Sequence, residues 1–261
     1  MNEVLLDVAD GVALVRLNRP AQGNALNTAL KTALLSALRK AAGDEAVRAV
    51  VLTGEGEAFT VGQDLRELRQ ALAADPERAG ETVEKHYNPI TLLLATMPKP
   101  VIAAVNGTCV GAGLGFALAC DLQVWSSQAT LATAFHKVGL TCDSGLSATL
   151  VQAVGRARAL SLMLQAEPFT PHQAAQWGFA GDIVAPDQVR PHAMALARRL
   201  AQGPTKAIAA TKRLLLAAPS RTLPETLAAE AAEQTALGCT RDHSAAVEAF
   251  LTRRKPVFTG S

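Results

Sequence analysis

The stretch PVIAAVNGTCVGAGLGFALACD, residues 100–121, contains the residue spacing that most directly suggests chemistry. Its apolar run from Val101 to Val105 is typical of a buried strand. A glycine-rich turn follows, and the small and apolar residues from Ala112 onward suit a closely packed helix. A strand, a turn and a helix N-terminus in this order present free backbone N–H groups, which stabilise an anion or a developing oxyanion. A crowded strand–helix junction without chemical function is the alternative interpretation.

A second loop, FTVGQDL at residues 59–65, has the same order of strand, glycine turn and helix start. If the fold brings the two turns together, N–H groups near Gln63 and Ala112 face one site. Two backbone donors that converge on one oxygen are what an acyl enolate needs. Two independent strand–helix turns are the alternative.

Asp143 is a third candidate, because it lies at the end of a loop where another helix is expected to begin. From its position alone it would be an acid that stabilises the first turn of that helix through the helix dipole. Ser144, the next residue, is expected to cap the helix.

The elements that must position these residues alternate between strands and helices up to Arg156. The sequence predicts a hairpin at 3–18, a helix at 28–42 capped by Asn27, a strand at 47–52, a helix from Asp64, a mostly helical stretch at 76–97, and strands at 101–105, 122–125 and 130–132. This alternation indicates an α/β core with parallel strands. Beyond Arg156 the pattern is nearly all helical, in short pieces.

The composition is that of a globular protein. The chain has 261 residues, of which 49% are hydrophobic and 18% charged, whereas disorder needs the opposite balance. The net charge of +2 gives nucleic-acid binding no electrostatic support. There is neither a signal-peptide core nor an apolar run of the ~18 residues that span a bilayer. The four cysteines show no CxxC pairing and no histidine at metal-ligand spacing. We therefore expect a cytoplasmic protein with no metal site, nucleic-acid partner or membrane partner.

Several motifs, in order along the chain, resemble the crotonase (enoyl-CoA hydratase/isomerase) superfamily. They are NRP..NAL at 18–26, AFTVGQDL at 58–65, PKPVIAAVNGTCVGAGLGFALACD at 98–121, AFHKVGLTCDSG at 134–145 and WGFAGDIV at 177–184. The resemblance covers essentially the whole chain. It implies an α/β crotonase (ClpP-like) fold at 1–195, in which repeated ββα units form two roughly perpendicular sheets. It also implies a C-terminal helical region at 196–261 that mediates trimerisation.

The resemblance further implies an acyl-CoA substrate whose thioester carbonyl is held by the N–H groups of Gln63 and Ala112. The side chain of Gln63 is then expected to matter less than its N–H. No cofactor is expected, because coenzyme A is part of the substrate, and the assembly is expected to be a homotrimer or a dimer of trimers. The implied residues for CoA and substrate binding are Arg19, Gln22, Asn24, Ala25, Leu26, Ala58, Gly62, Asp64, Leu65, Val110, Gly111, Phe135 and Arg253. Arg253 resembles a position that reaches the CoA phosphates of a neighbouring subunit; a solvated basic helix end is the alternative.

The carboxylates at the motif positions indicate the reaction. The hydratases that resemble this chain carry two glutamates, at positions occupied here by Gly115 and Phe135. Neither residue can transfer a proton, so hydration is disfavoured. Asp143 matches a catalytic aspartate that occurs in ring-1,2-epoxyphenylacetyl-CoA isomerases, in some enoyl-CoA isomerases and in a 4-chlorobenzoyl-CoA dehalogenase. The dehalogenase also needs a tryptophan and a histidine, and Phe135 and Leu92 stand at those positions.

The resemblance is strongest to the ring-1,2-epoxyphenylacetyl-CoA isomerases, which share YNPI at 87–90, GRARAL at 155–160 and a terminal FTG. Cys142 and Leu146 depart from that pattern and leave the acyl group open. The predicted function is an acyl-CoA isomerase of phenylacetate or fatty-acid degradation that moves a proton through Asp143, whose pKa an apolar pocket should raise. The alternatives are an enoyl-CoA hydratase, an acyl-CoA hydrolase and a non-catalytic acyl-CoA-binding protein.

Overall fold

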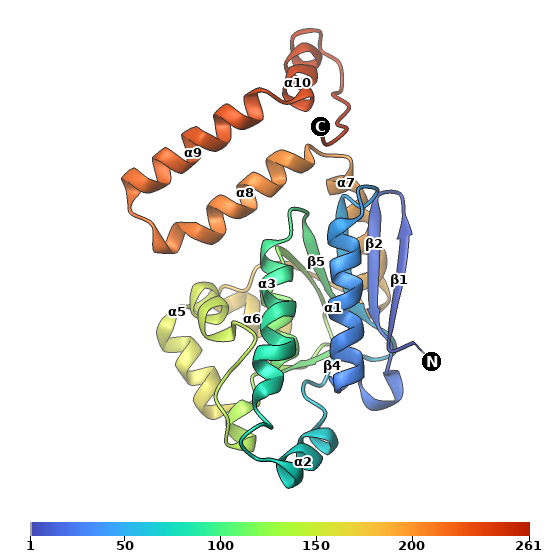
Figure 1. Cartoon of the computed structure of the whole chain (residues 1–261), viewed down its shortest axis with the longest axis vertical. Coiled ribbons are helices and arrows are strands. Elements are labelled where there is room, and N and C mark those ends of the chain that lie inside the picture. Colours follow the sequence, from blue (N-terminus) through green and yellow to red (C-terminus); the bar gives the residue numbers. More distant parts are fainter. Residues whose placement is uncertain (1) are drawn as a thin grey trace.

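Two β-sheets form the centre of the protein (Figure 1), whose computed structural model describes residues 2–261. The larger sheet has the order β1-β2-β3-β5-β7-β9, with β1 antiparallel to β2 and the other neighbours parallel. Its strands are β1 (Val4–Ala9), β2 (Val12–Leu17), β3 (Ala49–Gly54), β5 (Val101–Val105), β7 (Leu122–Ser126) and β9 (Asp182–Val184). The smaller, parallel sheet contains β4 (Ala58–Thr60), β6 (Thr108–Val110) and β8 (Leu131–Ala132). This arrangement confirms the predicted α/β class.

Helices cover both faces of the larger sheet. On one face lie α1, α3 and α4, and on the other lies α7. The helices of the described residues are α1 (Thr28–Gly43), α2 (Leu65–Ala74), α3 (Asn88–Thr96), α4 (Ala112–Ala119), α5 (Leu146–Gln165), α6 (Pro171–Trp177), α7 (Val189–Ala201), α8 (Thr205–Ala217), α9 (Leu223–Gly238) and α10 (Arg241–Leu251). A π-helical turn, η2 (Val83–Tyr87), leads into α3, and a short 3-10 turn, η3 (Phe135–Val138), lies between β8 and α5.

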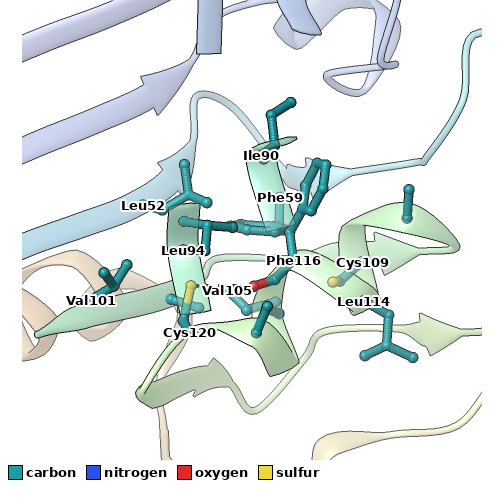
Figure 2. Close-up of a cluster of buried hydrophobic side chains, with 14 of the residues drawn as sticks. Leu52, Phe59, Ile90, Leu94, Val101, Val105, Cys109, Leu114, Phe116 and Cys120 are labelled. Carbon is teal, nitrogen blue, oxygen red and sulfur yellow. Dashed lines mark hydrogen bonds between the residues drawn. The ribbon is translucent and has the colours of Figure 1, made fainter. Parts of the chain in front are cut away.

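The core consists of two apolar layers, because successive side chains of a strand point to opposite faces of the sheet. On β3, Val50 and Leu52 belong to the layer that includes α1, α3 and α4, whereas Val51 belongs to the layer that includes α7. Figure 2 shows the first layer, where Phe59 of β4 and Phe116 of α4 lie among the aliphatic side chains of β3, α3 and β5. This layer holds α4 and the smaller sheet against the larger one.

Of the two predicted helix caps, Asn27 and Ser144, the first is present and the second is not. The Asn27 side chain accepts a hydrogen bond from the Leu30 N–H, and Asp64 caps α2 in the same way. The prediction that Ser144 caps α5 is wrong. Gly145, with φ of 71°, precedes the helix, and the Ser144 hydroxyl donates to the Asp143 carboxylate instead.

The chain beyond Arg156 differs from the nearly all-helical expectation at one place. β9 pairs in parallel with β7 and completes the edge of the larger sheet. It was missed because three residues form too short a run to show periodicity. Helix α7 crosses the expected division at 195/196 and packs on the sheet, while α8, α9 and α10 extend away from it as an arm (Figure 1). Among residues 2–261, no helix is long and apolar enough to cross a membrane.

Candidate functional site

The two glycine turns meet because their strands are parallel neighbours in the smaller sheet. Ala58 pairs with Thr108 on β6, so β4 and β6 end at the same edge, and each continues through a glycine turn into a helix. The turns then approach so closely that a Cβ on Gly62 would lie 3.0 Å from the Val110 carbonyl oxygen and 4.0 Å from Cα of Gly111. The two glycine turns therefore lie next to each other, as the sequence-based hypothesis of a shared site requires.

Gln63 and Ala112 both line a cavity of about 1610 Å³ at this edge. Within residues 2–261, neither N–H has a hydrogen-bond acceptor. The Ala112 N–H is at the start of α4, directly after Gly111, whose φ of 58° and ψ of −123° turn the chain into the helix. A conformation of this kind is open to glycine and strained for other residues. Each turn thus contributes to the cavity lining one residue whose N–H has no acceptor among the described residues.

The loop before α1, residues 18–26, forms a second wall of the cavity. Most of its polar groups make hydrogen bonds within the protein. Arg19 Nη1 donates to the Ala25 carbonyl oxygen over 2.5 Å and to the Asp64 carboxylate over 3.0 Å. Asn24 is fully buried, and its amide nitrogen donates to the carbonyl oxygens of Glu55 and Ala58. Asn24 therefore shapes the loop rather than the cavity surface.

The predicted binding residues divide into two groups. Those that line the cavity are Arg19, Gln22, Ala25, Gly62, Asp64, Leu65, Val110, Gly111 and Phe135. The side chains of Asn24, Leu26 and Ala58 are buried beneath this surface and lie outside the lining. Arg253 follows the end of α10, which lies far from α2 in Figure 1, and it does not line the cavity within one chain.

Asp143 lies on the cavity wall between η3 and α5. The Ser144 hydroxyl donates to its Oδ1 over 2.8 Å, and no N–H at the start of α5 donates to its side chain among the described residues. The Asp143 side chain therefore does not cap α5, and stabilisation through the helix dipole stays the alternative to a chemical role. Burial raises the pKa of Asp143, while the Ser144 hydrogen bond and the positive charge of Lys31 partly oppose that increase. The direction agrees with the sequence-based expectation.

Gly115 faces the same loop and explains why a hydratase-type glutamate is absent there. A Cβ at this position would lie 2.6 Å from the Ser144 Cβ and 2.8 Å from the Ser144 carbonyl oxygen. A side chain at 115 would therefore displace the loop that presents Asp143. Phe135, at the other hydratase position, is buried with an apolar ring at the cavity. Leu92, at the dehalogenase histidine position, is exposed on α3 and does not line the cavity.

The other cavity carboxylates are committed elsewhere or exposed. Asp64 caps α2 and pairs with Arg19. Glu67 accepts hydrogen bonds from the Thr28 N–H, over 2.8 Å, and from the Lys31 ammonium, over 3.5 Å. Glu77 is exposed to solvent. Of the lining carboxylates in residues 2–261, Asp143 alone is half-buried and accepts no hydrogen bond from a cation or from the first turn of a helix.

Sequence reasoning missed a polar network behind the Gln63 turn. Lys31 is fully buried on α1 and donates to Thr82 Oγ1 over 2.7 Å and to Gln63 Oε1 over 3.2 Å. The Tyr87 hydroxyl donates to the same Gln63 oxygen. The available signal was periodicity: Lys31 lies three residues before Leu34 on the apolar stripe of an amphipathic helix, where a charged side chain is unexpected.

Comparison with known proteins agrees with this architecture. The enoyl-CoA hydratase/isomerase family model matches residues 7–261. A relative from Rhodobacter capsulatus named a probable enoyl-CoA hydratase is 39% identical over 97% of this chain and 96% of its own length. The 1,2-epoxyphenylacetyl-CoA isomerase of Escherichia coli is 36% identical over 100% of this chain and 99% of its own length.

A solved structure shows the same fold. The crystal structure of an enoyl-CoA hydratase/isomerase-type protein from Mycobacterium abscessus has a TM-score of 0.95 and 45% identity, covering 99% of this chain and 100% of that chain. Sequence and structure agree over nearly the full length in these comparisons. The chain therefore belongs to the enoyl-CoA hydratase/isomerase family and has the crotonase fold.

Proposed function

We propose that this protein is an acyl-CoA isomerase that stabilises a thioester enolate and moves a proton through Asp143. The observation that carries the proposal is the state of Asp143: a half-buried carboxylate on the cavity wall, with a raised pKa and no hydrogen bond from a cation or a helix N-terminus. A carboxylate desolvated in this way is a stronger base than an exposed one.

The free N–H groups of Gln63 and Ala112 support an oxyanion site for the thioester carbonyl oxygen. Negative charge accumulates on this oxygen as the enolate forms, and each preorganised donor is worth ~3 kcal/mol of the barrier. With a 3-enoyl-CoA, Asp143 would take a proton from C2, and the charge would spread onto the carbonyl oxygen. The protonated Asp143, which can exchange its proton with solvent, would then protonate C4 to give the 2-enoyl isomer. With an epoxide substrate, the same acid–base group would assist ring opening.

Hydration receives less support. It requires a second acid to position and activate water, and the matching positions hold Gly115 and the apolar Phe135. The relatives bear both kinds of name, so the distinction rests on these residues rather than on similarity. The name of the Escherichia coli relative supports 1,2-epoxyphenylacetyl-CoA as a substrate. An enoyl-CoA is the other proposed substrate, and phenylacetate or fatty-acid degradation is the proposed pathway.

Product analysis tests the proposal. The protein is incubated in deuterated water with a 3-enoyl-CoA and, separately, with crotonyl-CoA. Conversion of the first to the 2-enoyl isomer with deuterium uptake supports isomerisation. Formation of 3-hydroxybutyryl-CoA from the second would establish hydration, and release of free coenzyme A would establish hydrolysis. Tight acyl-CoA binding without turnover of these thioesters or of the ring epoxide would favour a non-catalytic binding protein.

We also propose that the protein assembles as a homotrimer, or as a dimer of trimers, through the arm formed by α8, α9 and α10. The arm exposes large apolar side chains, with Phe250 84% and Leu223 70% exposed, more than a monomer usually leaves in water. In an assembly, Arg253 of the same arm could reach the CoA phosphates of another subunit. We expect sedimentation equilibrium to give three or six chain masses, and Phe250→Asp to reduce them. A wild-type monomer at micromolar concentration would contradict the proposal.

A further inference from the structure

Lys31 is a buried charge in a place where packing alone would favour leucine. Its side chain has no exposed surface, it belongs to the apolar face of α1, and it does not line the cavity. Taking an ammonium group out of water is expensive unless its protons are all bound. Here they are bound, to Thr82, Gln63 and Glu67 at 2.7, 3.2 and 3.5 Å.

Gln63 is the point where this buried charge meets the cavity. Its side-chain oxygen accepts hydrogen bonds from both the Lys31 ammonium and the Tyr87 hydroxyl. Its backbone is fixed on both sides by Leu26, whose N–H donates to the Gly62 carbonyl over 2.8 Å and whose carbonyl accepts from the Asp64 N–H over 3.3 Å. The side chain and both flanking peptide units are thus held, and the Gln63 N–H keeps one direction.

Tyr87 connects the network to the second turn. It ends the π-helical turn η2, a form that is rare and concentrated at functional sites. Its ring lies 5.9 Å from that of Phe116 on α4, the helix that begins at Ala112, and the Lys31 nitrogen lies 5.2 Å from its centre. One buried cluster therefore supports both N–H groups on the cavity wall.

We infer that Lys31 is a positioning residue for the acyl-CoA reaction: with Tyr87 it holds the Gln63 side chain, aims the Gln63 N–H at the thioester oxygen, and places a fixed positive charge behind the site. The identity of the substrate in this inference rests on the proposed function. The positioning of the Gln63 N–H and the placement of the buried charge rest on the geometry of Lys31, Gln63 and Tyr87.

The charges around Lys31 give the inference a measurable signature. Burial lowers the pKa of Lys31, and the carboxylates of Glu67, Asp143 and Asp64 oppose that decrease. Burial raises the pKa of Asp143, and the charge of Lys31 acts in the opposite direction and lowers it. Burial, and after it the charge of Lys31, lowers the pKa of His86 on η2. Removing the Lys31 charge should therefore raise the pKa of Asp143 further.

The groups that face Asp143 and titrate or carry charge are few. They are Lys31 and the Tyr87 phenol, whose pKa burial raises and which stays neutral; Ser144 adds a hydrogen bond. Glu67 faces Lys31 and Tyr87 from α2. Lys31 is thus the one positively charged group among those that face Asp143. Removing its charge should therefore change the pKa measured for the Asp143 carboxyl.

The test compares Lys31→Met, Lys31→Arg and Tyr87→Phe with wild type. The pKa of Asp143 is measured in the free protein by carbon-13 NMR of labelled aspartate, with the resonance assigned by its absence from Asp143→Asn. The dependence of kcat/KM on pH is measured in parallel, and near-ultraviolet circular dichroism checks the fold. Lys85→Met is the matched control, because Lys85 is an exposed lysine of η2 that pairs with Glu81.

Lys31→Met is expected to move the Asp143 titration and the acid limb of kcat/KM to higher pH, and to lower kcat by about 10- to 100-fold with little change in KM. Lys31→Arg keeps the charge and should return the limb toward wild type. Tyr87→Phe should lower kcat without moving the limb, since it removes a neutral donor. This variant remains informative if Lys31→Met does not fold.

A folded Lys31→Met protein with wild-type Asp143 titration and wild-type kcat would overturn the inference, as would equal effects in Lys85→Met. If Tyr87→Phe is the variant that folds, unchanged kcat would overturn it too. If Lys31→Met changes the pKa of Asp143 but the wild-type protein turns over no thioester, the electrostatic coupling between Lys31 and Asp143 is supported. The proposed isomerase function is then the part that fails.

Discussion

Replacing Asp143 by asparagine is expected to lower kcat for isomerisation by about 10²- to 10⁴-fold, the usual contribution of a positioned acid–base group. The amide has nearly the same shape, and its oxygen can still accept the hydrogen bond from the Ser144 hydroxyl. It cannot take up a proton. Because the N–H groups of Gln63 and Ala112 are unchanged, the dissociation constant for the acyl-CoA should stay within a few-fold of wild type.

The measurement is single-turnover conversion of a 3-enoyl-CoA in deuterated water, together with acyl-CoA binding by calorimetry. Glu84→Gln is the matched control, since it removes a carboxylate from an exposed position on η2 outside the cavity lining. Wild-type turnover and deuterium uptake in Asp143→Asn would rule out this aspartate as the proton carrier, and the base would have to be sought elsewhere.

The same carboxylate predicts a pH dependence with a definite sign. Asp143 must be ionised to act as a base, and burial raises its pKa above the ordinary value, so kcat/KM should fall with decreasing pH at a higher pH than for an exposed aspartate. The folded state also binds this proton more tightly than the unfolded state, so Asp143 makes stability decrease as pH rises through this range. Asp143→Asn should therefore unfold at an equal or higher denaturant concentration at neutral pH.

Much of the site could be predicted because its parts are local. The turn after β4 and the turn after β6 each show a strand, glycines and a helix start within a few residues, and Asn27 and Asp64 mark helix starts by their own side chains. The pairing of β4 with β6 could not be predicted from composition or periodicity, since three-residue strands carry little pattern. Only the family resemblance implied that Gln63 and Ala112 share one site.

The rest depends on contacts between distant segments. Lys31 and Gln63 are 32 residues apart, and Tyr87 is a further 24 residues along the chain, yet all three share one oxygen. The family resemblance implied that the Gln63 side chain would matter less than its N–H. In the structure the Gln63 side chain accepts a hydrogen bond from the buried Lys31 ammonium, so the side chain connects that charge to the turn that carries the N–H. Asn24 shows the converse, because a residue in a binding motif proves to be a buried support for its loop.

Replacing Gly111 by alanine is expected to lower kcat by about 10²- to 10³-fold, because it disturbs the peptide unit that carries the Ala112 N–H. The difficulty is conformational rather than spatial. A Cβ at 111 would have its nearest neighbour, the Thr133 carbonyl oxygen, at an ordinary 3.7 Å, but φ of 58° with ψ of −123° strains any residue other than glycine. The Gly111 N–H is held by the Ala132 carbonyl over 3.0 Å, and α4 is buried in the core. The strain of an alanine at position 111 is therefore expected to rotate the peptide unit between residues 111 and 112, which carries the Ala112 N–H.

Activity alone would not separate a lost donor from a damaged fold, so a second measurement is the infrared stretch of the bound thioester carbonyl. Two donors on the oxygen should shift this band to lower frequency in wild type, and Gly111→Ala should reverse part of that shift. The same substitution should lower the free energy of unfolding by about 1–3 kcal/mol. Gly43→Ala is the matched control, because Gly43 ends α1 with ordinary φ and open space around its Cα. A Gly111→Ala protein that keeps both the carbonyl shift and kcat would remove Ala112 from the oxyanion site and leave Gln63, with Lys31 behind it, as its principal donor.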